Sequence, residues 1–273
     1  MARAWKSCSE GIAFSSSNAR GKPIRAEAKM RAMSALPPLT PEQIARYREE
    51  GFLPLGPVLG DAELAALRAE EERFRLSVAY GGPANQTLFV NVQLCHRSEP
   101  VRRFCTQGRH VPAVVQLLGP DVCLTHQQFV TKLPDRAEQR SDIPFHQDDG
   151  YGRLDPPHDL TLWVALVDVD ETNGCLWVVP RSHARGLLEH GRAAVNPLLR
   201  EAAAGADAIA LPMRAGEGVA FTGLTLHRSG PNHSASPRPG LFVRYCHPHV
   251  KMASEGNRPV LEDPHSWMIA GRA

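Results

Sequence analysis

The sequence predicts a mainly β fold with flanking helices: a double-stranded β-helix of the jelly-roll or cupin-like type, buttressed by N-terminal helices. Helical signals fill the first part of the chain, and alternating strand patterns replace them from residue 122 onward. The length of 273 residues also suits this class, because closed all-β domains commonly need about 200 to 250 residues. We therefore expect residues 37–273 to form a single domain.

Four helices are expected before the strands. Each combines a capping or proline signal with apolar positions at helical spacing, and Gly119-Pro120 closes the last one. The expected helices are Pro41–Glu50 with Thr40 as N-cap, Asp61–Ser77, Pro100–Thr106 and Val111–Leu118.

Six segments with strand-type residues and period-two alternation follow. The expected strands are Cys123–Lys132, Asp159–Asp168, Cys175–Val179, Ala208–Met213, Gly218–Thr222 and Leu241–His247. Helices first and strands later are the order that a buttressed jelly roll requires.

His146-Gln147-Asp148 is a candidate metal-binding motif. Pro144 favours an extended backbone before it, so alternation should point His146 and Asp148 to one side and Gln147 to the other. A third ligand could come from His227, at the end of the β-rich segment Val219–His227. Two imidazoles and one carboxylate leave up to three coordination positions open, as in non-haem Fe(II) oxygenases.

Arg238 lies eleven residues after His227, beyond the turn-forming stretch Gly230-Pro231-Asn232. Such a turn would let the chain reverse and return the arginine to the same pocket. A guanidinium can bind a carboxylate through two parallel hydrogen bonds, so Arg238 suits a dicarboxylate.

Several motifs together resemble the phytanoyl-CoA dioxygenase family of Fe(II)- and 2-oxoglutarate-dependent oxygenases. The resemblance covers roughly residues 37 to 250, and the order and spacing of its motifs agree with the family. It rests on Leu39–Gln43, Gly51–Leu55, His146-Gln147-Asp148, Trp163–Leu166, Asn173–Leu176, Pro180–His183 and His227–Asn232 through Arg238.

The resemblance implies roles for individual residues. It makes His146, Asp148 and His227 the iron ligands, and it makes Arg238 the partner of the distal carboxylate of 2-oxoglutarate, assisted by Ser229. Two further cofactor-lining positions are implied at Gln128 and Trp163. Core packing explains Trp163 equally well, and Gln128 could instead satisfy a buried backbone group. Tyr151 is a candidate substrate contact beside the iron.

The implied activity is hydroxylation of a C–H bond of a small or medium organic substrate, with 2-oxoglutarate and O2 as co-substrates and release of succinate and CO2. Asp148 favours hydroxylation over halogenation, because halogenating relatives lack this carboxylate, while desaturation and ring formation stay open. Two alternatives also remain: another jelly-roll metalloprotein, such as a cupin-type or zinc enzyme, and a non-catalytic 2-oxoglutarate-binding module. Residues 79–96, 150–158 and 184–207 are expected to supply walls and a lid, with a covering helix at Leu187–Ala204.

Composition excludes several other classes. Residues 1–36 carry a net charge of +5, so the remainder carries −3 and offers no basic surface for nucleic acid. The basic segment is expected to be disordered; its composition also fits a transit peptide, and translation from Met33 is an alternative. No membrane span or secretory signal is recognisable, and the six cysteines lack metal or disulfide spacing. We expect a cytoplasmic enzyme.

Other titratable residues near these motifs are expected to play no part in the iron site. Alternation should turn Asp149 away from the metal. His126 should either face the cavity or form a hydrogen bond in the interior. His247-Pro248-His249 could in principle bind a metal, but it is expected to be a surface loop, because it lacks a nearby carboxylate and the proline interrupts strand pairing.

Overall fold

The computed structural model describes residues 35–77, 87–136, 139–190 and 207–271. The expected disordered extension, residues 1–36, lies almost wholly outside these ranges, as does most of the expected covering helix. The described helices are α1 (Pro41–Glu50), α2 (Asp61–Arg75), α3 (Glu99–Gln107) and α4 (Val111–Leu118). All four agree with the predicted helices within two residues, and none of them is long and apolar enough to cross a membrane.

The described strands form three antiparallel sheets. The seven-stranded sheet has the order β1-β9-β6-β11-β3-β14 with β2 also paired to β3, the second sheet has the order β4-β10-β7-β8, and the third has the order β13-β12-β5. Their bounds are β1 (Phe52–Pro57), β2 (Leu88–Val92), β3 (Val122–Lys132), β4 (Ile143–His146), β5 (Leu154–Asp155), β6 (Asp159–Ala165), β7 (Leu176–Val178), β8 (Ile209–Leu211), β9 (Glu217–Phe221), β10 (His227–Ser229), β11 (Arg238–Cys246), β12 (Lys251–Met252), β13 (Arg258–Pro259) and β14 (Trp267–Ala270).

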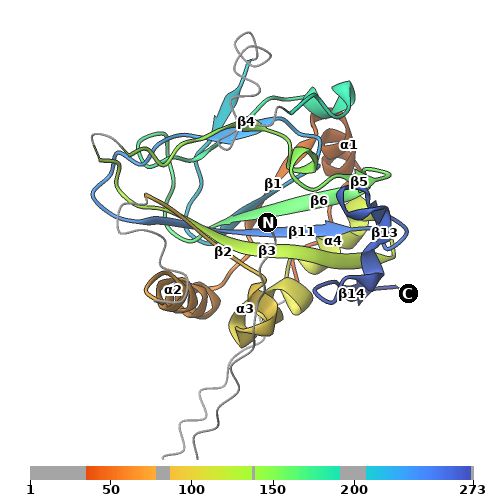
Figure 1. Cartoon of the computed structure of the whole chain (residues 1–273), viewed down its shortest axis with the longest axis horizontal. Helices are drawn as coiled ribbons and strands as arrows, with labels where there is room; N and C mark the ends of the chain where they lie inside the picture. The colour runs from red at the N-terminus through yellow and green to blue at the C-terminus, as the bar shows by residue number, and fades with distance from the viewer. Residues whose placement is uncertain (1–34, 78–86, 137–138, 191–206, 272–273) are drawn as a thin grey trace, which may run out of the picture. The chain divides into compact units, whose positions relative to one another are not determined.

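The seven-stranded sheet is covered on both faces. Helices α2 and α3 lie against one face, and the sheet that contains β4 lies over the other (Figure 1). Two facing antiparallel sheets supported by helices are the architecture of a double-stranded β-helix, which confirms the predicted fold class.

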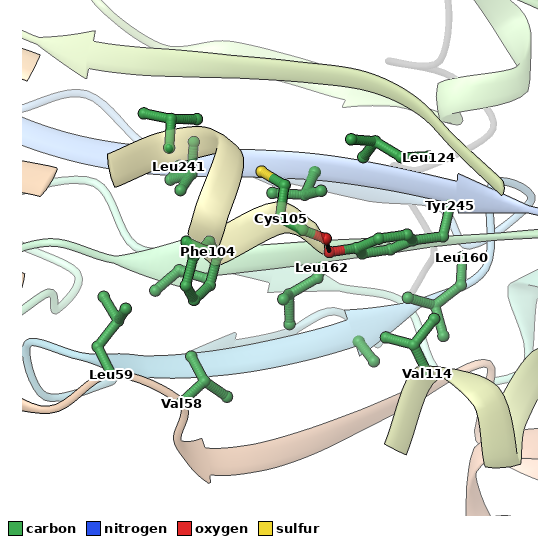
Figure 2. Close-up of a cluster of buried hydrophobic side chains, with 14 of the residues drawn as sticks. Val58, Leu59, Phe104, Cys105, Val114, Leu124, Leu160, Leu162, Leu241 and Tyr245 are labelled. Atoms are coloured by element: carbon green, nitrogen blue, oxygen red, sulfur yellow. Dashed lines mark hydrogen bonds between the residues drawn. The ribbon is translucent and has the colours of Figure 1, made fainter. Parts of the chain in front are cut away.

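The main apolar core lies between the helices and the large sheet. Phe104 of α3 and Val114 of α4 pack over Leu162 of β6 and Leu241 of β11, all of them buried (Figure 2). Burying such a side chain contributes roughly 1.5 to 3 kcal/mol. The buried Tyr245 hydroxyl donates to the Cys105 carbonyl at 2.7 Å, so this polar atom is satisfied within the core.

Strand β11 separates the core from the opposite side of the sheet. Leu241, Val243 and Tyr245 join the apolar core, whereas Arg238 and Phe242 line a cavity on the other face. Successive side chains of a strand point to opposite faces, so one strand supplies both the core and the cavity wall.

The structure corrects the expectation for the segment Val219–His227. The strand in this segment, β9, ends at Phe221, and His227 begins a separate strand, β10, in the four-stranded sheet. Thr222 and Thr225 occupy the break, where Thr225 N–H donates to the Thr222 carbonyl at 2.9 Å. The break moves the chain from one sheet to the other, which a continuous β pattern does not reveal.

Candidate active site

His146, Asp148 and His227 converge at one point in the four-stranded sheet. Strands β4 and β10 are neighbours, and His227 lies directly opposite His146 in their register. The Asp148 Oδ1 atom lies 3.8 Å from His146 Nε2 and 3.7 Å from His227 Nε2. All three residues are buried, and each offers a ligand atom within 4.8 Å of the others. Three buried donors this close together can share a single metal ion.

The hydrogen bonds of both imidazoles favour metal binding through Nε2. His146 Nδ1 donates to the Pro144 carbonyl at 2.8 Å, and His227 Nδ1 donates to the Thr225 carbonyl at 2.9 Å. These contacts assign the ring hydrogen to Nδ1 and leave a lone pair on Nε2, which faces Asp148. Burial lowers the pKa of His146 to about 3, so its imidazole stays neutral and able to bind a metal.

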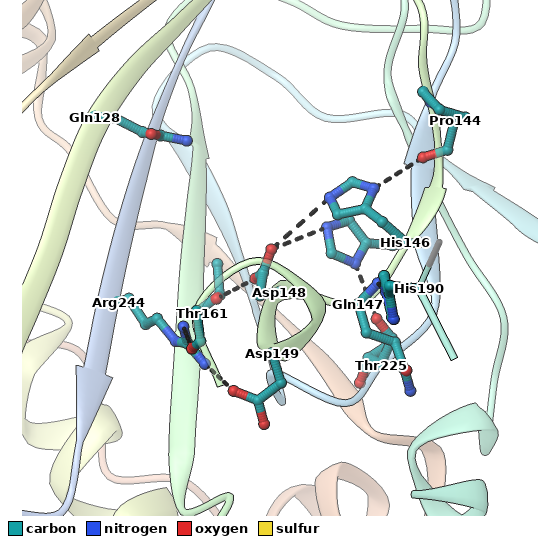
Figure 3. Close-up of polar contacts among 12 residues, drawn as sticks. Gln128, Pro144, His146, Gln147, Asp148, Asp149, Thr161, His190, Thr225 and Arg244 are labelled. Atoms are coloured by element: carbon teal, nitrogen blue, oxygen red, sulfur yellow. Dashed lines mark hydrogen bonds and ion pairs between the residues drawn. The ribbon is translucent and has the colours of Figure 1, made fainter. Parts of the chain in front are cut away.

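Thr161 of β6 holds the Asp148 carboxylate in its orientation. Asp148 begins a short 3₁₀ turn, Asp148–Gly150, directly after the extended Gln147. The Thr161 hydroxyl donates to Asp148 Oδ2 at 2.6 Å, so Oδ1 is the oxygen that faces the two imidazoles (Figure 3). The seven-stranded sheet, which carries Thr161, therefore positions the candidate ligand Asp148.

An ion-pair network centred on Arg244 also holds the Asp148–Gly150 turn in place. Arg244 of β11 contacts both Asp149 and Asp159, and its Nη1 donates to the Gly152 carbonyl at 2.9 Å (Figure 3). Burial and the neighbouring Asp159 raise the pKa of Asp149 to about 6. Its contact with Arg244 turns Asp149 away from the candidate metal ligands, as expected.

Gln147 ties the ligand segment to its surroundings. This fully buried residue donates from Nε2 to the carbonyls of Gly186 at 2.9 Å and Leu224 at 2.7 Å, and its Oε1 accepts from Leu188 N–H at 2.8 Å. Its own N–H donates to His190 Nε2 at 3.1 Å. The residue between two candidate ligands therefore fixes the backbone that carries them.

The three residues open into a cavity of about 600 Å³ that also contains Arg238. Arg238 is 1% exposed, and its Nε and Nη1 have no hydrogen-bond partner in the described part of the chain. Its guanidinium lies 5.4 Å from the centre of the Trp163 ring. Burial lowers the pKa of Arg238 to about 10, so it remains a cation at neutral pH. A buried cation with unsatisfied donors fits an anionic ligand.

Comparisons with known proteins agree with this geometry. The family model described as phytanoyl-CoA dioxygenase (PhyH) matches residues 47–240, most of the chain. The chain belongs to the phytanoyl-CoA dioxygenase family. As a member of it, the chain is an Fe(II)- and 2-oxoglutarate-dependent dioxygenase, which confirms the prediction from sequence.

Individual relatives differ in their named activities. Peroxisomal phytanoyl-CoA dioxygenase of Bos taurus is 28% identical over 77% of this chain and 70% of that protein. Among solved structures, the α-ketoglutarate-dependent carbocyclase SnoK of nogalamycin biosynthesis has a TM-score of 0.70 at 25% identity, covering 83% of this chain and 90% of that one. The non-haem monooxygenase ThoJ has a TM-score of 0.65 at 26% identity, with 85% and 84% covered.

The structure brings the other predicted site residues to the same cavity. Gln128, Trp163 and Ser229 all line it, and so does Tyr151, whose ring lies 5.3 Å from that of His146. In the described residues, no hydrogen bond joins Ser229 to Arg238. Instead the Ser229 carbonyl accepts from the buried Lys132 Nζ at 3.1 Å.

His126 both faces the cavity and forms a hydrogen bond in the interior, so both expectations for it are met. It lines the cavity, and its Nε2 forms a 3.0 Å hydrogen bond with Gln128 Oε1. Burial lowers the pKa of His126, which keeps the ring neutral. The pair therefore presents a fixed polar group in the cavity that contains the candidate metal-binding residues.

The cavity walls match the sequence only in part. Predicted wall residues 88–93 and 151–154 contribute, but a C-terminal segment adds Met252, Glu255 and Asp263. These residues follow the last predicted motif and carry no recognisable signal. The three-stranded sheet explains the position of Met252, because Met252 of β12 pairs with Leu154 of β5 at the end of the 151–154 wall.

Proposed function

We propose that His146, Asp148 and His227 bind the Fe(II) ion and that Arg238 binds the distal carboxylate of 2-oxoglutarate. One observation carries this proposal: a cluster of two imidazoles and a carboxylate shares a single cavity with a buried, unsatisfied guanidinium. This donor set suits iron with open positions, and the guanidinium suits the dicarboxylate co-substrate.

The reaction that fits is hydroxylation of a substrate C–H bond. Iron and its co-substrates supply the oxidation, in which substrate, O2 and 2-oxoglutarate give the hydroxylated product, succinate and CO2. The protein positions the reactants: the carbonyls of Pro144 and Thr225 fix the imidazole tautomers, and Thr161 orients the Asp148 carboxylate. A bound carboxylate would supply the hydrogen-bond acceptors that the buried Arg238 guanidinium lacks among the described residues.

The substrate is proposed to be a small or medium organic molecule. The cavity of about 600 Å³ is within the range of small-molecule sites. Gln128 and Trp163 are proposed to line the co-substrate, and Tyr151 to contact the substrate. Relatives are named for phytanoyl-CoA oxidation, methylphosphonate hydroxylation and carbocycle formation, so the family name does not define the substrate.

We also propose that residues 37–273 form one catalytic domain and that the enzyme works in the cytoplasm. The family match at residues 47–240 lies inside this range. Mammalian relatives are named peroxisomal, so fractionation of cells that produce the full chain tests the compartment directly. Recovery of the enzyme with an organelle would contradict the proposed location.

Anaerobic titration of the metal-free protein with Fe(II) and 2-oxoglutarate tests the residue roles. The wild-type protein should develop the weak visible charge-transfer band of the iron chelate. Arg238→Ala should weaken 2-oxoglutarate binding by about 10- to 100-fold, because it removes charge-assisted hydrogen bonds. Asp148→Ala should abolish the Fe(II)-dependent formation of succinate.

Two further variants serve as controls. Arg238→Lys keeps the positive charge but not the planar guanidinium that can donate two parallel hydrogen bonds. It should therefore bind 2-oxoglutarate more weakly than wild type and more tightly than Arg238→Ala. Arg153→Ala removes an exposed arginine at the cavity wall and should leave 2-oxoglutarate affinity unchanged. Equal affinity in Arg238→Ala and wild type would refute the assignment of Arg238.

A further inference from the structure

A second cluster of histidines lies where β6 begins and β11 ends. His158 directly precedes β6, while His247 and His249 follow β11. The three residues offer ligand atoms that lie within 4.8 Å of one another. His247 N–H donates to the His158 carbonyl at 3.0 Å, so the two strand ends hold the cluster together. None of the three lines the active-site cavity.

The hydrogen bond of His158 leaves one of its ring nitrogens suited to a metal, and His247 has only a long contact at the corresponding nitrogen. His158 Nε2 donates to the Leu118 carbonyl at 2.9 Å, which leaves a lone pair on Nδ1. His247 Nδ1 accepts a long hydrogen bond of 3.2 Å from His249 N–H, which a metal at Nδ1 would replace, and its Nε2 faces Asp121 Oδ2 at 3.8 Å. A carbonyl or carboxylate behind the opposite ring nitrogen is the usual support of a metal-binding histidine.

Asp121 corrects the expectation that no carboxylate lies near His247 and His249. It is 126 positions earlier in the chain than His247, and only the folded structure brings the two together. The expectation of a surface loop is confirmed, because β11 ends at Cys246 and His249 is exposed. The loop is nevertheless packed against two other segments.

The three rings pack against one another, and solvent can reach the cluster at His249. The ring centres of His247 and His249 are 4.2 Å apart, and their Nδ1 atoms lie 2.5 Å from each other. Two nitrogen lone pairs at this distance repel unless one nitrogen carries a proton or both contact the same cation. His158 stacks on His247 at 5.1 Å, and the exposed His249 leaves an entry path.

We propose that His158, His247 and His249 bind a divalent transition-metal ion, with Zn²⁺ as the probe. An all-imidazole donor set favours Zn²⁺, Cu²⁺ or Ni²⁺ over Mg²⁺, Ca²⁺ or Mn²⁺, and three histidines with one open position are a known zinc arrangement. The site differs from the His146, Asp148 and His227 cluster in having no carboxylate among its donors. It shares no residue with that cluster, so it stands whether or not the proposed iron ligands are correct.

A bound ion would join the start of β6 to the end of β11 and would bind only the folded chain. Ligands that bind only the native state raise its stability by mass action, so the melting temperature should rise with Zn²⁺ concentration. The effect should persist when the active-site cluster is removed.

Zn²⁺ titration of the metal-free full chain, in competition with a chromophoric chelator, tests the proposal. The Asp148→Ala/His227→Ala variant should still bind one Zn²⁺ and melt at a higher temperature when it is present. Adding His247→Ala and His249→Ala to that variant should abolish both effects. In an otherwise wild-type chain, these two histidine substitutions should leave the Fe(II)-2-oxoglutarate band unchanged.

His233→Ala is the matched control, because His233 is exposed and belongs to neither cluster. This substitution should leave the number of bound Zn²⁺ ions unchanged. The proposal is overturned if the Asp148→Ala/His227→Ala variant binds no Zn²⁺. It is equally overturned if substituting His247 and His249 leaves the stoichiometry and the thermal shift as they were, or if His233→Ala removes the same ion.

Discussion

The hydroxyl of Thr161 offers the most direct test of how the proposed iron ligands are positioned. Thr161→Val keeps the shape and the β-strand preference of the side chain but removes its 2.6 Å hydrogen bond to Asp148 Oδ2. Both residues are buried, so water cannot readily replace the lost donor. Hydrogen bonds to charged groups contribute about 1.5 to 3 kcal/mol, which corresponds to roughly 10- to 150-fold in an equilibrium constant.

We therefore expect Thr161→Val to raise the dissociation constant for Fe(II) by about 10- to 100-fold, the range found when residues supporting metal ligands are replaced. Anaerobic Fe(II) titration of the metal-free protein in saturating 2-oxoglutarate measures this change. Thr131→Val is the matched control, since Thr131 is also a fully buried strand threonine whose hydroxyl donates to a carboxylate, Glu71 Oε1, at 2.7 Å. An Fe(II) affinity within twofold of wild type in Thr161→Val, or an equal loss in Thr131→Val, would refute the reasoning.

Two other predictions concern stability and the co-substrate pocket. Burial lowers the pKa of His110 to about 3, so below pH 6.5 the unfolded chain binds a proton that the folded chain does not. Stability should fall by up to about 1.4 kcal/mol per pH unit between pH 6.5 and 3, and the slope should be shallower in His110→Gln, as measured by urea unfolding at several pH values. Equal slopes in the wild type and in His110→Gln would contradict the assignment of this pH dependence to His110. Gly240→Ala places a Cβ 2.5 Å from the Trp163 ring, so it should displace the indole beside Arg238, weaken 2-oxoglutarate binding and cost about 1 to 3 kcal/mol of stability. Gly230→Ala, whose nearest contact would be 3.8 Å, should do neither; similar losses in both variants would show that Trp163 is not the cause.

The fold class and the convergence of the triad could be predicted from sequence because their signals are local or depend on spacing. Alternation after Pro144 predicted that His146 and Asp148 would converge, and the turn before Arg238 predicted that the arginine would return to the cavity. The structure brings these residues together, while their binding roles stay predictions.

The supporting contacts could not be predicted in this way. Thr161 lies in an apolar run that looks like any buried strand, and only the facing sheets bring its hydroxyl to Asp148. The same holds for Gln147, whose partners Gly186 and Leu224 lie 39 and 77 residues away. Such contacts depend on tertiary pairing, which residue patterns do not encode locally.

The two faces of β11 restrict where the sequence of this enzyme can tolerate insertions and deletions. Deleting one residue in the middle of the strand would shift its register and turn Leu241 or Val243 toward the cavity while forcing Arg238 or Arg244 into the apolar core. Catalysis and folding would fail together. New substrate preferences are therefore expected to arise through the peripheral walls at residues 88–93 and 252–263, where insertions leave that strand untouched.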